Sequence, residues 1–82
     1  MLVLKSNIAI SDSGFIFNPQ NGETFKVNPI GLQVIKMLQA KKNKEEIIEA
    51  MILEYDISDE VFERYYNDFI RSLEHEDLIE KI

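Results

Sequence analysis

The hydrophobic period of this chain changes abruptly at Asn28-Pro29. Before that pair, Phe25 and Val27 flank Lys26, and such a two-residue period is typical of a strand with one buried face. After it, apolar residues recur at helical spacing: Leu32, Val34, Ile35 and Leu38. An asparagine oxygen can accept a hydrogen bond from a free amide of the first helical turn. Proline in that turn loses no hydrogen bond, because an amide there has no partner within the helix. The chain is therefore expected to divide here into a strand half and a helical half.

Three short strands are predicted within residues 2 to 27. Their period-2 patterns centre on residues 8–10, 15–17 and 25–27. The segments between them, SDSG (11–14) and NPQNGE (18–23), are rich in residues that favour turns. We therefore expect two hairpins and a small antiparallel sheet, in which residues 24 to 28 form an edge strand if the sheet follows chain order.

Three helices are predicted after the strands. The second begins with a capping box, Asn43 with Glu46, and the third begins after Ser58 and runs from about Asp59 to Glu76. The third helix carries a stripe expected to be core, made of Phe62, Tyr66, Phe69 and Leu73, with Ile70 beside it. A second stripe lies about 100 degrees away. Its members are Val61, Tyr65, Asp68 and Ser72.

The fold class that follows is α+β, a winged-helix-like domain with a three-stranded antiparallel sheet followed by three helices. Residues 78–82 are expected to close the core as an extended tail. Eighty-two residues with 45% hydrophobic content predict one domain spanning 1–82. The absence of cysteine excludes disulfides and thiol chemistry, and no signal peptide or membrane span is recognisable, so we expect a cytoplasmic protein.

Charge is unevenly distributed between the two halves. Residues 1–44 carry six lysines against two acidic residues, whereas residues 45–82 carry three basic and thirteen acidic residues. The third helix region, 58–77, holds seven acidic residues against Arg64 and Arg71. Because phosphate contact needs a basic face, we expect no binding of nucleic acid through this helix.

Catalytic and metal-binding chemistry is not expected. His75 is the single histidine and lies among acidic residues near a helix end, with no partner for a metal site or a nucleophile. Carboxylate pairs such as Glu45/Glu49 lie on exposed helix faces, and the three glycines do not form a phosphate loop. We therefore expect a protein that is not an enzyme and has no cofactor.

With catalysis and metal binding set aside, the remaining possibility is a surface that binds a partner. An edge strand at 24–28 leaves one side of its backbone unpaired, so it can accept an extended peptide by strand addition. Val61 and Tyr65 on the second stripe of the third helix could supply side-chain pockets beside it. The alternative for these two residues is that they only widen the edge of the core.

The sequence resembles the PqqD-like proteins, also called RiPP recognition elements, from about Ser11 to the C-terminus. The most specific motif is an apolar residue before Asn-Pro-x-Gly, here Val27 followed by residues 28–31. Weaker matches are Gly22-Glu23-Thr24, Glu45-Glu46-Ile47, and the spacing of Phe69, Leu73 and Leu78. The chain departs from the family at QAKKNK (39–44) and at Tyr65-Tyr66, so we expect a groove that is more aromatic than usual in the family.

This resemblance implies a protein that binds the leader part of a ribosomal precursor peptide and presents it to a modifying enzyme, often a radical S-adenosylmethionine protein. The peptide would add a strand to residues 24–28 and lie against the third helix. The residues implied in peptide binding are Thr24, Phe25, Lys26, Val27, Asn28, Val61, Arg64, Tyr65, Asp68 and Ser72. Three alternatives stay open: a nucleic-acid-binding winged helix, an enzyme-docking subunit, and a homodimer paired through the edge strand.

Overall fold

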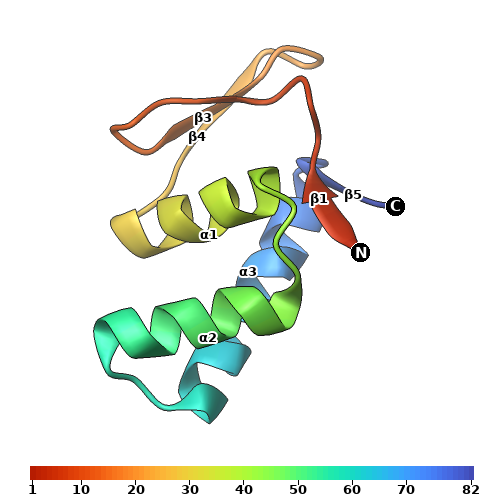
Figure 1. Ribbon diagram of the computed structural model, residues 1–82. Coiled ribbons are helices and arrows are strands. Elements are labelled where there is room, and N and C mark those ends of the chain that lie inside the picture. The colour runs from red at the N-terminus through yellow and green to blue at the C-terminus, as the bar shows by residue number, and fades with distance from the viewer.

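The computed structural model describes all residues, 1–82. Four strands precede three helices, and a fifth strand follows them at the C-terminus (Figure 1). The strands are β1 (Leu2–Leu4), β2 (Ala9–Ile10), β3 (Phe15–Asn18), β4 (Glu23–Lys26) and β5 (Ile79–Lys81). The helices are α1 (Pro29–Gln39), α2 (Lys44–Tyr55) and α3 (Asp59–His75). This architecture confirms the predicted α+β class with three helices after an antiparallel sheet.

The three-stranded sheet has the order β2-β3-β4, so β4 is an edge strand as predicted. Its register pairs Ile16 with Phe25 and Phe15 with Lys26. Ile16 is fully buried, whereas Phe15 and Phe17 are 45% and 40% exposed. Both alternating rows of this strand are apolar, so the sequence pattern alone could not tell which one faces the core. Packing of Ile16 over the helices decides it.

A second sheet was not expected from the sequence. β1 pairs antiparallel with β5, and Leu4 lies opposite Ile79. Residues 2–27 therefore hold four strands instead of three, and the predicted extended tail is a strand. This pairing brings the two termini side by side, away from the β3–β4 hairpin (Figure 1). Strands of three residues each carry too little pattern to reveal a partner more than 70 residues away.

Local capping fixes the helix starts at the predicted residues. The Asn28 side chain accepts the Gly31 amide at 2.8 Å, and Ser58 accepts the Val61 amide at 3.2 Å. The capping box of α2 is complete, with Asn43 Oδ1 and the Glu46 amide 2.8 Å apart. Such caps satisfy amides that have no partner within the helix.

One hydrophobic core joins both sheets to the helices. Its fully buried members include Ile16 from β3, Ile35 from α1, Ile47 from α2 and Phe62 from α3. Figure 1 shows α1 between the β3–β4 hairpin and α2, so the hairpin and α2 lie on opposite sides of α1. The edge strand β4 is thus held on one side of a packed helical body.

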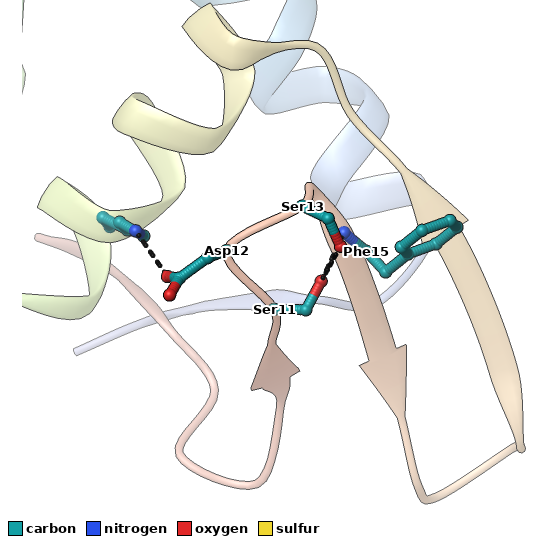
Figure 2. Close-up of polar contacts among 5 residues, drawn as sticks. Ser11, Asp12, Ser13 and Phe15 are labelled. Carbon is teal, nitrogen blue, oxygen red and sulfur yellow. Dashed lines mark hydrogen bonds and ion pairs between the residues drawn. The ribbon is translucent and has the colours of Figure 1, made fainter.

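The turn before β3 is built from side chains as well as backbone. The hydroxyl of Ser11 accepts the Phe15 amide at 3.0 Å and lies 3.1 Å from the hydroxyl of Ser13 (Figure 2). Asp12 pairs with Lys36 of α1 at 3.1 Å. This exposed ion pair contributes little to stability, yet it links the turn to α1.

Gly14 ends this turn and touches β4. Its φ is +95°, and a Cβ at this position would lie 2.6 Å from the carbonyl oxygen of Val27. The Gly14 carbonyl in turn accepts the Val27 amide at 2.9 Å. Glycine is required here both by the positive φ and by the close approach of the β4 backbone.

We expect Gly14→Ala to lower the free energy of unfolding by about 2–4 kcal/mol, because strain and a backbone clash add together. Gly22→Ala is the matched control: Gly22 has φ +77° and no atom near its missing Cβ. Strain alone should cost this variant about 1 kcal/mol. Urea denaturation of both variants measures the difference, and equal losses would show that the contact with Val27 is unimportant.

Candidate functional site

The open edge of β4 presents two sets of unpaired backbone groups. Val27 donates its amide to Gly14, so these two residues form a hydrogen-bonded pair. Hydrogen-bonded and non-hydrogen-bonded pairs alternate in antiparallel sheets, so the Phe15–Lys26 and Phe17–Thr24 pairs are non-hydrogen-bonded. The N–H and C=O groups of Lys26 and Thr24 therefore point away from β3 and are available to another strand.

An aromatic row runs along α3. Tyr65 stacks on Phe69 with ring centroids 5.8 Å apart and lies 5.5 Å from Phe62. Val61, one turn before Tyr65, is 56% exposed. Tyr65 and Phe69 are half-buried, and burial raises the pKa of the Tyr65 phenol. The row Val61, Tyr65 and Phe69, spaced four residues apart, forms an apolar ridge with one hydroxyl.

The sequence pattern predicted Phe69 in the core stripe of the third helix and not in the peptide-binding site. It is half-buried and lies on the Tyr65 side of the helix. The spacing i, i+4, i+8 from Val61 through Tyr65 could have placed it there, but the pattern of Phe62, Tyr66 and Leu73 fitted it equally well. Because an aromatic residue between two stripes fits either of them, only its contacts settle its position.

Gly31 connects the ridge to the end of β4. A Cβ at Gly31 would lie 3.1 Å from the Phe69 ring and 3.3 Å from Asn28 Oδ1. Phe69 therefore packs on the first turn of α1, immediately after β4. This contact explains why a glycine suits the fourth position of the Asn-Pro-x-Gly motif.

The polar residues predicted on α3 do not converge on one point. Arg64, Asp68 and Ser72 are all exposed. Asp68 pairs with Arg71 at 3.3 Å, and the Ser72 hydroxyl donates to the Asp68 carbonyl at 3.3 Å. Arg64 forms no ion pair within 4.0 Å. Two of these three side chains thus already have partners within the helix.

The edge strand was predicted at 24–28, but β4 ends at Lys26, so Val27 and Asn28 lie just after it. The predicted edge residues divide according to the face of the sheet. Thr24 and Lys26 are exposed on the outer face, whereas Phe25 and Val27 are half-buried against the core. A cavity of about 320 Å³ lies at the end of β4, where Lys26, Val27 and Asn28 meet Leu32 of α1 and the 12–14 turn. None of the cavities is lined by both β4 and α3. The contact of Phe69 with Gly31 places the α3 ridge next to the chain that follows β4.

Asn28 is occupied as a helix cap. Its side chain accepts the Gly31 amide, so its role in the free protein is structural. We expect Asn28→Ala to lower the free energy of unfolding by about 1 kcal/mol and Asn28→Asp to retain most of it, because aspartate caps equally well. Thermal or urea unfolding measures both changes. If neither variant is less stable than wild type, the cap contributes nothing to the free energy of unfolding.

The remaining surface offers no comparable site. No group of three or more metal-ligating side chains comes together, and no helix is both long and apolar enough to cross a membrane. The exposed acidic residues of α3 count against phosphate contact, as expected from the sequence. The open β4 edge beside the α3 ridge is the distinctive surface of this domain.

Fold and site together define a small winged-helix-like domain with an open sheet edge at β4. Residues 14–79 match the family of coenzyme PQQ synthesis protein D, PqqD. The chain belongs to the PqqD family, and the resemblance noted in the sequence is confirmed.

Two solved structures have the same fold. TbiB1, in complex with the TbiA(beta) leader peptide, is 26% identical, with a TM-score of 0.87 over 98% of this chain and 96% of that chain. The lasso peptide synthetase B1, complexed with the leader peptide, is 17% identical, with a TM-score of 0.85 over 98% of each chain. No match was found among curated proteins.

Proposed function

We propose that this protein binds the leader segment of a ribosomally made precursor peptide without being a catalyst, by adding the peptide as a strand to β4. The observation that carries the proposal is the open β4 edge, with the outward amides of Thr24 and Lys26 beside the α3 ridge. Two proteins of the same fold have leader peptides as partners, which supports the same class of ligand here.

Strand addition supplies affinity that depends little on the peptide sequence. Thr24 and Lys26 each offer one donor and one acceptor, so up to four backbone hydrogen bonds can form. At about 1 kcal/mol net each, these bonds give weak binding alone. Burial of apolar peptide side chains against Val61, Tyr65 and Phe69 adds affinity and selectivity.

The proposed peptide-binding residues fall into two groups. The β4 group provides backbone pairing, and the α3 group provides side-chain contacts. They are Thr24, Phe25, Lys26, Val27 and Asn28, and then Val61, Arg64, Tyr65, Asp68, Ser72 and the added Phe69. Asn28 acts by fixing the angle between β4 and α1, and Ser72 and Asp68 would have to exchange their present partners to contact the peptide.

The second partner is a modifying enzyme, often a radical S-adenosylmethionine protein in the family that the sequence resembles. Holding the leader raises the effective concentration of the precursor at that enzyme, so affinity for both partners accelerates modification. The β3–β4 hairpin and α2 lie on opposite sides of α1 (Figure 1), so a bound leader leaves the α2 side free.

The proposal is tested by titrating isotope-labelled protein with the leader peptide of a precursor encoded beside this chain. We expect amide shifts concentrated in residues 24–28 and 61–72, with β1 and β5 unaffected. Shifts spread over the whole chain, or absent at saturating peptide, would contradict binding at β4.

The same edge can pair with a second copy of the chain. An antiparallel pair centred on Phe25 would bond Thr24 of one copy to Lys26 of the other, and it would use the same amides as the peptide. We therefore expect any homodimer to dissociate when leader peptide is added. Sedimentation of the protein with and without peptide measures this competition, and a dimer that binds peptide without dissociating would use another surface.

A further inference from the structure

Lys26 is a cation without an acidic partner. Lys5, Lys36, Lys44 and Arg71 form the ion pairs of the structure, and Lys26 is not among them. Its ammonium lies over the Phe15 ring instead, 5.4 Å from the centroid. A cation resting on an exposed aromatic ring is held weakly, so a carboxylate can displace this contact.

The position of Lys26 relates it to the open edge. Its backbone N–H points outward, and its side chain lies on the exposed outer face of the sheet with Phe15, its cross-strand partner. A strand added to β4 would lie about 4.8 Å away and place every second side chain on this face. One of these side chains would stand directly beside Lys26.

The two faces of the added strand would contact different kinds of side chain. On the inner face, the neighbours in β4 are Phe25 and Val27, which are half-buried against the core. On the outer face, the neighbours are Lys26 and Thr24, both exposed. Opposite charges on directly opposed residues stabilise a strand pair, and like charges destabilise it.

We infer that the peptide segment bound at β4 carries an aspartate or glutamate opposite Lys26, with apolar residues immediately before and after it. Lys26 then selects peptides by charge, in addition to its backbone pairing. This inference rests on the proposed strand addition and specifies the class of peptide that the edge accepts.

The experiment selects binders from a displayed library of random 12-residue peptides against the wild-type protein. Peptides that bind wild type and fail to bind Thr24→Pro are kept, because this variant removes an outward amide and leaves the Lys26 ammonium in place. We expect these sequences to contain an acidic residue between two apolar ones. The affinity of a synthetic peptide from this set is then compared with the affinity of a copy in which lysine replaces the acidic residue.

Lys26→Glu should weaken binding of the acidic peptide about fivefold and strengthen binding of the lysine peptide by a similar factor. A change in affinity of about fivefold corresponds to a charge-pair effect at the upper end of the usual range. Lys26→Arg should still bind the acidic peptide more tightly than the lysine peptide, as wild type does. Lys42→Glu, in the exposed turn between α1 and α2, is the control for the same change in net charge. It should leave both affinities within about twofold.

Each result separates the inference from the function on which it rests. Edge-dependent peptides without an acidic preference, or an unchanged order in Lys26→Glu, would overturn the charge selection and leave strand addition intact. If every selected peptide binds Thr24→Pro as well as wild type, or if no peptide is selected, both strand addition and the inference drawn from it are wrong.

Discussion

Lys26→Pro is expected to weaken binding of the leader peptide at least about 100-fold while the domain stays folded. Proline removes the outward N–H and places its ring where the added strand would approach. The ladder between β3 and β4 loses nothing, because Lys26 belongs to a non-hydrogen-bonded pair. A 100-fold loss corresponds to about 2.7 kcal/mol of binding free energy. Isothermal titration calorimetry measures the affinity, and circular dichroism reports the fold.

Two variants define the cause of this loss. Lys26→Ala keeps the backbone donor and should bind within about fivefold of wild type, since only the side-chain contact is lost. Val27→Pro removes the amide that bonds to Gly14 at 2.9 Å, so it should destabilise the fold itself. If folded Lys26→Pro binds like wild type, the peptide does not add to the β4 edge.

Tyr65→Asp is expected to reduce leader binding about 30-fold to 100-fold. The Tyr65 ring is half-buried between Phe62 and Phe69, and the new carboxylate would be carried into an apolar contact on binding. Fluorescence anisotropy of a labelled leader peptide measures the change. Tyr65→Phe retains the ring and should bind within a few-fold of wild type.

The matched control for charge is Tyr55→Asp at the end of α2. Tyr55 is an exposed tyrosine whose hydroxyl donates to Gln33, and it lies outside the α3 ridge. The same tyrosine-to-aspartate change there should leave peptide affinity unaltered. Equal losses in both variants would point to a general charge effect and not to a contact at Tyr65.

Tyr65→Asp also separates peptide capture from enzyme docking. If the modifying enzyme binds a surface away from the α3 ridge, this variant should still bind the enzyme while failing to bind the leader. A pull-down with the purified enzyme measures this directly. Loss of both partners from a folded variant would place the two binding surfaces together.

The parts of the fold that depend on neighbouring residues were predictable from the sequence. Asn28-Pro29 ends the strand and begins α1, because the cap is formed by residues three apart. The same holds for the capping box at Asn43, the cap at Ser58 and the turn at 18–23. The edge position of the last hairpin strand also followed, since hairpins of this length place consecutive strands side by side, although the strand ends at Lys26 and not at residue 28.

Other features depend on contacts between distant residues. The β1–β5 pair joins the two ends of the chain, and its strands are too short to specify a partner. Ile16 faces the core and Phe15 faces outward because of packing against the helices, since an apolar run fits either orientation. Phe69 joins the α3 ridge because it contacts Gly31, which lies 38 positions earlier in the chain.

The sequence by itself determined where the helices begin, where the β3–β4 hairpin turns and which family the chain belongs to, because those properties reside in local motifs. Only the tertiary structure decided which amides of β4 face outward. That choice depends on the pairing of Val27 with Gly14, and shifting the register by one residue would direct the Phe25 and Val27 amides outward instead. Lys26 thereby combines a free backbone edge with an unpaired charge on the outer face.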